Sequence, residues 1–321
     1  MSKTRKALIC GVSGQDGTYL ARLLLEKGYE VWGTSRDAQA SSFANLSCLG
    51  ILDRVKTISM AVNDFRSVLQ AISRSEPDEI YNLSGQSSVG LSFEQPAETL
   101  ESIATGTLNL LEGMRFLGLP IRFYNAGSGE CFGDISGFAA DEGTPFRPRS
   151  PYAVAKATAH WLVANYRTAY GLFACTGILF NHESPLRPLR FVTRKIIRAA
   201  VRISKGSNEK LALGNTDITR DWGWSPEYVD AMWRMLQTDN PDDFVIATGE
   251  SNSLEKFVQT SFSEVGLDWR HHVVQDLGLF RPAEILYSCG NAEKAKRILR
   301  WEASFKMPDV VREMIRHEQR M

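Results

Sequence analysis

Residues 7–17 read ALICGVSGQDG, a short apolar run followed by a glycine-rich turn. Gly11, Gly14 and Gly17 follow a predicted strand and open a predicted helix that ends near Lys27. Glycine in such a turn lets the backbone approach a pyrophosphate, whose charge then lies at the helix N-terminus. A tight turn without any ligand is the alternative, but a strand–turn–helix context near the N-terminus favours a dinucleotide-binding turn.

The chain up to residue 182 alternates short apolar segments with helical periodicity. Strands are expected at residues 7–10, 29–33, 55–60, 79–83, 121–126 and 173–179, and helices at 18–27, 65–74, 99–117 and 152–170. Strands that alternate with helices of ten or more residues are typical of parallel sheets covered on both faces. The sequence therefore predicts an α/β fold with a doubly wound, Rossmann-type parallel sheet.

The alternation becomes less regular after residue 182. Helices are expected at residues 191–203, 226–238 and 254–265, strand-like segments at 211–213 and 244–247, and two short amphipathic helices beyond residue 291. We predict a dinucleotide-binding domain at residues 1–182 and a smaller α/β substrate-binding portion at residues 183–321. Some C-terminal strands are expected to return to the main sheet.

Composition narrows the range of partners and compartments. The 37 basic and 37 acidic side chains give a formal net charge of zero, which predicts neither nucleic acid nor a membrane surface as a partner. No apolar run reaches the ~18–20 residues that a membrane-spanning helix needs. The five scattered cysteines form no CxxC pair, so we expect reduced thiols, no metal site and a cytoplasmic location.

A second motif, YAVAK at residues 152–156, carries catalytic side chains. Tyr152 and Lys156 are four residues apart, so they share one face of the predicted helix that Ser150 and Pro151 begin. The lysine charge is expected to lower the tyrosine pKa, so that the phenol can act as a base near neutral pH. Such a pair also occurs by chance on surface helices, but a dinucleotide turn upstream favours the catalytic interpretation.

The predicted strand at residues 121–126 runs into further candidates, Ser128 and Glu130. The carboxyl ends of parallel strands form the ligand crevice, where Ser128 could hydrogen-bond an alcohol or carbonyl. Glu130 would face the same crevice if the segment is extended. A reductase needs serine, tyrosine and lysine, so an adjacent glutamate indicates a second proton transfer; a loop charge or turn cap is the alternative.

Residues after the second and third strands bear on the choice of cofactor. Arg36 stands where NAD-binding proteins usually carry an acidic residue, and an arginine there suits a 2′-phosphate, which favours NADP. Asp37 could instead hold a ribose, and Asp64 could hold the adenine or cap the helix that follows it. The candidate cofactor-binding residues are Gly11, Gly14, Gln15, Asp16, Gly17, Arg36, Asp64, Leu83, Tyr152 and Lys156.

These motifs, with several longer stretches, resemble the GDP-mannose 4,6-dehydratases, a nucleotide-sugar-modifying group of the extended short-chain dehydrogenases/reductases. The resemblance runs nearly end to end. Its most specific stretches are residues 14–20 (GQDGTYL), 80–83 (IYNL), 147–156 (RPRSPYAVAK), 177–185 (GILFNHESP), 191–195 (FVTRK), 220–223 (RDWG), 231–233 (AMW) and 280–284 (FRPAE).

The resemblance implies an internal redox elimination on a hexose. The family's Thr-x-Glu pattern falls on Ser128 and Glu130, and its tyrosine and lysine fall on Tyr152 and Lys156. Hydride would pass from C4 of GDP-mannose to NADP and return to C6, with loss of water between the two transfers. Tyr152 would take the 4-hydroxyl proton and Glu130 the C5 proton, which accounts for a carboxylate beside the other three residues.

The resemblance also implies a nucleotide-sugar site and a homodimer or homotetramer. Cations with forked donors suit a diphosphate, and a carboxylate suits a guanine or sugar edge. A solvated basic face is the alternative for the basic residues. The candidate substrate-binding residues are Asn181, Glu183, Lys195, Arg220, Arg281 and Glu284.

Three segments depart from the family pattern. Residues 127–130 read GSGE where the family usually has Ser-Thr-Ser-Glu, and Gly129 predicts a more flexible loop. Residues 186–190 read LRPLR in place of an Arg-Gly-Glu-like loop, which leaves a related sugar such as a GDP-manno-heptose open. Asp37 replaces one of two paired arginines, which would weaken the preference for NADP and an oligomer contact.

Two other functions remain open from the sequence. A GDP-sugar reductase or epimerase would use Ser128, Tyr152 and Lys156 without needing Glu130. A catalytically silent NADP-binding sensor could share the fold, although an intact Tyr152 and Lys156 argue against it.

Overall fold

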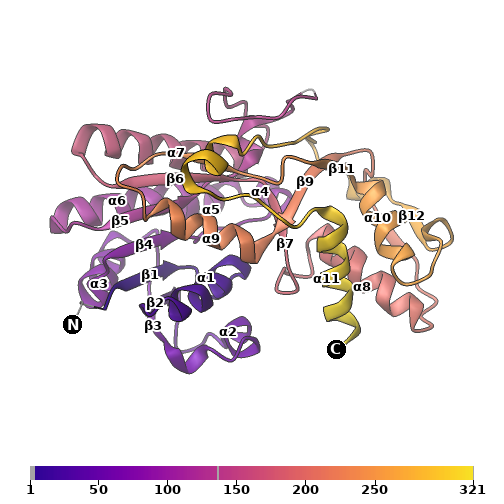
Figure 1. Ribbon diagram of the computed structural model, residues 1–321, viewed down its shortest axis with the longest axis horizontal. Helices are drawn as coiled ribbons and strands as arrows, with labels where there is room; N and C mark the ends of the chain where they lie inside the picture. The colour runs from indigo at the N-terminus through magenta and orange to yellow at the C-terminus, as the bar shows by residue number, and fades with distance from the viewer. Residues whose placement is uncertain (1–3, 136, 321) are drawn as a thin grey trace.

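The computed structural model describes residues 4–135 and 137–320, and its centre is a seven-stranded sheet (Figure 1). The strand order is β10-β6-β5-β4-β1-β2-β3, and every neighbouring pair is parallel. The strands are β1 (Lys6–Cys10), β2 (Glu30–Ser35), β3 (Val55–Ser59), β4 (Glu79–Asn82), β5 (Arg122–Ala126), β6 (Ala174–Leu179) and β10 (Phe244–Ile246).

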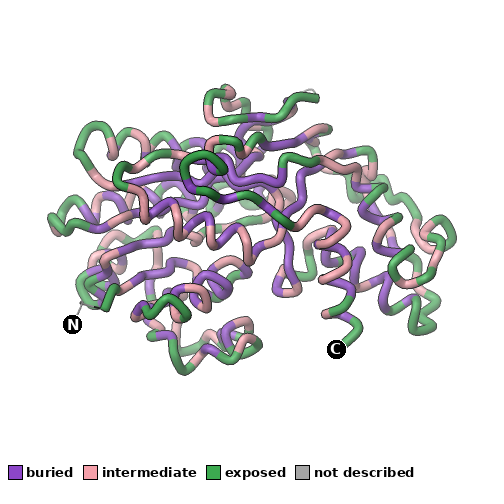
Figure 2. The backbone as a smooth tube through the Cα atoms, in the orientation of Figure 1, coloured by how far each residue is buried: buried purple, intermediate pink, exposed green. Residues whose placement is uncertain are grey.

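Helices cover both faces of this sheet. Alternate residues of β1 show the division: Ile9 packs into a core with α1 and α9, whereas Leu8 packs into a core with α3, α6 and α7. The bounds are α1 (Gln15–Glu26), α3 (Phe65–Ser75), α6 (Gly106–Leu117), α7 (Pro151–Tyr170) and α9 (Ser225–Met235). Period-two alternation between two cores confirms the predicted doubly wound Rossmann-type sheet. Its central strands β4 and β6 are buried along their whole length, whereas the edge strand β3 is partly exposed (Figure 2).

The helix predicted at residues 99–117 is divided into three parts. A short helix, α5 (Pro96–Leu100), leads into a π-helical turn at Glu101–Thr105, and α6 follows. The loop after β4 lies against this wide turn, where the Gln86 backbone N–H donates to Ser102 Oγ at 3.2 Å. Hydrophobic periodicity detects the apolar face of the helix and is insensitive to one wide turn.

The chain beyond β6 adds two small sheets with a core of their own. One has the order β11-β9-β7 and the other pairs β12 with β8. The strands are β7 (Asn181–Glu183), β8 (Leu211–Leu213), β9 (Thr219–Trp224), β11 (Ser251–Ser253) and β12 (Val273–Gln275), and the covering helices are α8 (Val192–Ser204), α10 (Leu254–Ser263) and α11 (Met307–Gln319). Trp222, Phe257 and Met314 are buried together between these elements.

Two C-terminal elements pack with the first part of the chain. Strand β10 pairs with β6 at the edge of the large sheet, and α9 packs on α1.

The short helices α2 (Ala44–Cys48) and α4 (Val89–Glu94) follow β2 and β4. The division of the chain at residue 182 stays a prediction.

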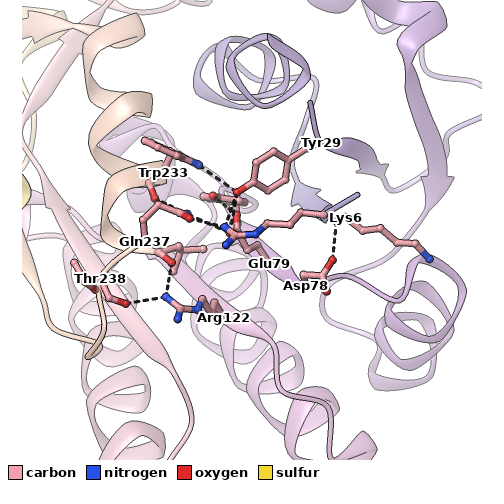
Figure 3. Close-up of polar contacts among 11 residues, drawn as sticks. Lys6, Tyr29, Asp78, Glu79, Arg122, Trp233, Gln237 and Thr238 are labelled. Atoms are coloured by element: carbon pink, nitrogen blue, oxygen red, sulfur yellow. Dashed lines mark hydrogen bonds and ion pairs between the residues drawn. The ribbon is translucent and has the colours of Figure 1, made fainter. Parts of the chain in front are cut away.

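A network of polar side chains lies at the amino ends of the strands of the large sheet (Figure 3). Glu79, the first residue of β4, is buried and accepts hydrogen bonds from Tyr29 (3.0 Å), Gln237 (3.1 Å) and Tyr81 (2.7 Å). Arg122 donates to the carbonyl of Thr238 at 2.7 Å. These bonds therefore hold the segment after α9 against β4 and β5.

Among residues 4–135 and 137–320, no helix combines the length and the apolar character needed to span a bilayer.

Candidate functional site

A cavity of about 410 Å³ lies at the carboxyl ends of β4, β5 and β6. Its opposite wall comes from the C-terminal portion, mainly β7, α8 and β9. This is the position at which open parallel sheets bind their ligands. The predicted catalytic and substrate-binding residues all line the cavity: Ser128, Glu130, Tyr152, Lys156, Asn181, Glu183, Lys195, Arg220, Arg281 and Glu284.

Two helix starts position the predicted catalytic side chains. Ser128 caps the 3₁₀ helix Gly129–Phe132, and its Oγ accepts the Glu130 backbone N–H at 3.2 Å. Ser150 caps α7 by accepting the Ala153 N–H at 3.1 Å. Both caps satisfy donors that a helix start would otherwise leave unpaired. The first turn of α7 and the residues after β5 lie on the same wall of the cavity.

The ammonium group of Lys156 is held inside this wall. Lys156 Nζ donates to the carbonyl oxygen of Ala126, the last residue of β5, at 2.7 Å, and lies 5.8 Å from the ring centre of Tyr152. Burial lowers the pKa of Lys156 to about 8, because a desolvated ammonium loses its proton more readily. The group can therefore change charge within the working pH range of many enzymes.

The pKa of Tyr152 differs from the expectation drawn from the sequence. Burial raises it above the ordinary value for tyrosine, and a hydrogen bond with Ser128 offsets part of this effect. The sequence predicted a lowered pKa from the Lys156 charge, and this prediction is wrong. Desolvation of the phenolate is the largest effect on Tyr152, and the Lys156 ammonium is bonded to the Ala126 carbonyl instead.

Glu130 shares the cavity with two arginines and a second glutamate. Burial raises the pKa of the Glu130 carboxyl, while the charges of Arg220 and Arg281 act to lower it and Glu284 acts to raise it. Glu284 Oε1 lies 3.2 Å from Arg220 and 3.3 Å from Arg281. A carboxyl with a raised pKa is a stronger base than an ordinary glutamate and suits proton transfer.

The glycine turn packs closely against neighbouring backbone at two of its glycines. Gly11 has φ +86°, and a Cβ there would lie 2.8 Å from the Leu83 carbonyl oxygen. A Cβ on Gly17 would lie 2.4 Å from the Gly11 oxygen. Glycine is therefore required at both positions, and the turn opens onto the N-terminus of α1 with Gly14 as its cap. This arrangement fits a dinucleotide pyrophosphate.

The side chains of Gln15 and Asp16 are bound by protein groups. Gln15 Nε2 donates to the His182 carbonyl at 3.1 Å, and Ser184 Oγ donates to Gln15 Oε1 at 2.8 Å. Asp16 Oδ1 accepts from Ser225 Oγ at 2.8 Å, and its Oδ2 lies 2.8 Å from His182 Nε2. Both side chains thus join the start of α1 to segments far along the chain.

Arg36 and the two nearby acids have separate positions. Arg36 is exposed at the end of β2. Asp37 Oδ1 accepts the backbone N–H groups of Gln39 (2.9 Å) and Ala40 (3.0 Å), so one oxygen of its carboxylate is directed into its own loop. Asp64 caps α3 by accepting the Arg66 N–H at 2.9 Å, which is the capping alternative left open by the sequence.

The substrate-side candidates already have partners in the protein. Lys195 Nζ donates to the Ala212 carbonyl at 2.7 Å. Glu183 Oε2 accepts from Thr193 Oγ1 at 2.7 Å and lies 3.3 Å from Arg187 Nε. These contacts hold the side chains in place along the wall.

The sequence reasoning missed several residues that also line the cavity. Arg187 and Arg190 flank the ring of Phe191, at 3.8 Å and 5.3 Å from its centre. These arginines belong to the segment that departs from the family pattern, and the available signal was two arginines three residues apart directly before a phenylalanine. Gly129 contacts Phe180, whose ring would lie 3.1 Å from a Cβ at that position, so a close ring contact explains this glycine.

Several solved structures share the fold over almost the whole chain. The UDP-glucose 4-epimerase of Thermotoga maritima with UDP-glucose has a TM-score of 0.88 at 20% identity, and covers 98% of this chain and 99% of its own. RMD from Pseudomonas aeruginosa complexed with NADPH has a TM-score of 0.81 at 21% identity, and covers 99% of each chain. At these identities the likeness establishes the fold.

Curated relatives are much closer in sequence. GDP-mannose 4,6 dehydratase 1 of Arabidopsis thaliana is 46% identical over 98% of this chain and 90% of its own length. The human GDP-mannose 4,6 dehydratase is 42% identical, over 98% and 92% respectively. The family model described as GDP-mannose 4,6 dehydratase matches residues 8–314. Sequence and fold agree along the whole length, and the chain belongs to the GDP-mannose 4,6-dehydratase family.

Proposed function

We propose that this chain converts GDP-mannose into GDP-4-keto-6-deoxymannose by an NADP-dependent 4,6-dehydration. The relatives named above from a plant and an animal, and a bacterial one from Sinorhizobium fredii, are GDP-mannose 4,6-dehydratases. The observation that carries the proposal is Glu130, which lines the same cavity as Ser128, Tyr152 and Lys156. A carboxylate beside these three residues provides the extra base that an elimination requires.

The residues present fit an NADP cofactor. The Gly11–Gly17 turn and the N-terminus of α1 suit the pyrophosphate, and the exposed Arg36 suits the 2′-phosphate. One structural relative, RMD, is complexed with NADPH. When bound, the cofactor supplies a nicotinamide that takes hydride from C4 of the sugar and returns it to C6.

Tyr152 and Lys156 act on the 4-hydroxyl group in this proposal. Tyr152 accepts the hydroxyl proton, Ser128 hydrogen-bonds the oxygen on which the ketone forms, and Lys156 stabilises the phenolate by its charge. The bond from Lys156 to Ala126 fixes the ammonium relative to β5, and Ser128 lies just beyond that strand. This bond therefore places the ammonium beside the strand that leads to Ser128.

Glu130 acts on C5. A ketone at C4 acidifies the C5 proton. Glu130 removes that proton and delivers it to the C6 hydroxyl, which leaves as water. The proton that Tyr152 took from the 4-hydroxyl returns to C5 when hydride reaches C6, so the protons balance.

The raised pKa of Glu130 strengthens it as a base, and Arg220 and Arg281 keep the carboxylate form accessible. These two arginines also suit the diphosphate of a GDP-sugar, as does Lys195, while Glu284 pairs with both arginines.

A homodimer or homotetramer belongs to the same proposal. The outer face of α7 exposes Trp161 and Val154, which are 62% and 43% accessible. Large apolar side chains at the surface support a contact with a second copy.

The replacement Glu130→Gln tests the function directly. Glutamine keeps the size of the side chain but removes the base, so we expect kcat for the 4-keto-6-deoxy product to fall by about 10²–10⁴-fold. Oxidation at C4, followed as NADPH absorbance in a single turnover, should persist. Mass spectrometry of the product identifies the loss of water.

Glu26→Gln is the matched control, because Glu26 is exposed at the end of α1 and makes a surface pair with Arg22. It should turn over at the wild-type rate. Formation of the dehydrated product by Glu130→Gln at the wild-type rate would contradict the role of Glu130 as the base. Absence of any dehydrated product from the wild-type protein supplied with NADP⁺ would contradict the proposed function and favour a reductase or epimerase.

A further inference from the structure

The imidazole of His182 lies between two hydrogen-bond acceptors. Its Nδ1 is 2.7 Å from the Phe180 carbonyl oxygen, and its Nε2 is 2.8 Å from Asp16 Oδ2. A neutral imidazole carries one N–H and can satisfy one of these acceptors, whereas an imidazolium donates to both. The geometry therefore favours a charged His182 with the Asp16 carboxylate as its counterion.

The surroundings of the pair agree with this assignment. Burial acts to lower the pKa of His182, and so does the charge of Arg187, but the Asp16 carboxylate and the Phe180 carbonyl outweigh them and raise it. The ring of Tyr228 stacks on the imidazole with centres 4.5 Å apart. Burial acts to raise the pKa of Asp16, yet His182 and the hydrogen bonds from Ser225 and Gln15 bring it well below its ordinary value.

The position of the pair links the two binding regions. Asp16 is in the first turn of α1, between Gly14 and Gly17. His182 is the middle residue of β7, between Asn181 and Glu183. Successive side chains of a strand point to opposite faces, so His182 meets α1 while its two neighbours face the substrate side.

Gln15 adds a second connection next to the ion pair. Its side-chain nitrogen donates to the His182 carbonyl, and its oxygen accepts from Ser184 Oγ. The adjacent side chains of Gln15 and Asp16 therefore fix the start of α1 to two residues of the opposite wall, His182 and Ser184.

We propose that Asp16 and His182 are positioning residues whose buried ion pair fixes the dinucleotide-binding turn against the wall of the sugar-nucleotide site. Loss of either charge leaves the other buried without its counterion, so the start of α1 and β7 separate. The nicotinamide side and the sugar side of the cavity then lose their alignment. The inference rests on the proposed function for the identity of the two ligands.

The first test measures the charge of His182 without any turnover. The ¹⁵N chemical shifts of the histidine side chains at pH 7.5 should show both His182 nitrogens protonated in the wild-type protein. In Asp16→Asn the counterion is gone, and the ring should be neutral at the same pH. A neutral His182 in the wild-type protein would overturn the proposal, and this measurement stands even if a variant folds poorly.

The second test compares ligand binding and turnover. In Asp16→Asn and His182→Gln, we expect the Kd for NADP⁺ to rise and kcat/KM for GDP-mannose to fall, each by roughly tenfold to a hundredfold. The double variant should show the same Kd and kcat/KM as the more impaired single variant, because both replacements remove the same interaction. Fluorescence titration and steady-state kinetics give the two quantities, and fully additive losses would contradict the coupling.

Asp243→Asn is the matched control. It removes the carboxylate of another ion pair, with Arg167, at the amino end of β10 and away from the cavity. It should lower stability while both ligand constants stay at the wild-type values.

The outcomes separate this inference from the proposed function. One outcome is that the wild-type protein does not dehydrate GDP-mannose but Asp16→Asn still lowers the affinity for NADP⁺. That result would contradict the proposed function and support the role of the ion pair. A wild-type protein that dehydrates GDP-mannose, with variants that bind and turn over equally well, would overturn the ion pair alone.

Discussion

The buried ammonium of Lys156 makes the stability of the nucleotide-free protein depend on pH. Its pKa is about 8 in the folded protein and 10.5 ordinarily, so between these values the unfolded chain binds the proton and the folded chain does not. Stability therefore rises with pH across this window, by about 1.4 kcal/mol per unit of pKa difference. Lys156→Met, which has no proton to lose, should lack this rise.

Urea denaturation of both proteins at pH 7.5 and pH 10 isolates the contribution, because other titrating groups affect both alike. The difference in unfolding free energy between wild type and Lys156→Met should shift in favour of the wild type at the higher pH. An identical pH dependence in the two proteins would show that folding does not lower the pKa of Lys156.

At the residue scale, the spacing of the motifs predicted which residues line the cavity, but it did not predict their pKa values. The pattern of Ser128, Glu130, Tyr152 and Lys156 was visible in the sequence, and all four line one cavity. Their pKa values depend on burial and on neighbours that are distant in the chain, such as Arg220 and Arg281 around Glu130. A linear sequence contains no direct measure of either effect.

The start of α3 offers a test at the scale of one element. Asp64 accepts the Arg66 backbone N–H, and a lost cap of this type costs about 1 kcal/mol of stability. We expect Asp64→Ala to lower the unfolding free energy by that amount and Asp64→Asn to restore most of it, since asparagine also caps helices. Urea denaturation measures both, and an equal loss in the two variants would show that the carboxylate charge matters and not the cap.

Elements were predictable where their length allowed a period to be seen. The strands of the large sheet and the long helices show clear periodicity, and they occur near the expected residues. Strands β8 and β10 also have three residues, and their apolar composition allowed them to be predicted. The three-residue strands β7, β11 and β12 were not predicted, and each pairs with a segment distant in the chain. The same limit applies to the π-helical turn before α6, which depends on its contact with the loop after β4.

At the scale of the whole molecule, the site depends on how the two parts of the chain meet. Tyr152 and Lys156 come from α7, while Arg220 comes from β9 and Arg281 from a later loop. Helix α9 packs on α1 and strand β10 pairs with β6, and these contacts determine how the two parts of the chain are arranged. Topology of this kind comes from long-range packing, so the sequence indicated the residues of the cavity without their mutual arrangement.

The network around Glu79 is the counterpart of the cavity at the other end of the sheet, and it should affect stability alone (Figure 3). Glu79→Ala would leave the donors of Tyr29, Tyr81 and Gln237 without their shared acceptor. Unsatisfied buried donors are costly, so we expect a loss of about 2–4 kcal/mol in unfolding free energy. Because Glu79 begins β4 and the cavity lies beyond its end, kcat should stay at the wild-type value.

Glu76 provides a control of the same residue type on the surface of the same region. It pairs with Lys6 at 3.1 Å but is 75% accessible, and exposed pairs contribute about 0–1 kcal/mol. Glu76→Ala should therefore unfold at nearly the wild-type urea concentration, whereas Glu79→Ala unfolds much earlier. Equal midpoints for the two variants would mean that the Glu79 network does not hold the segment after α9, and a fall in kcat for Glu79→Ala would mean that strain at this edge reaches the cavity through β4.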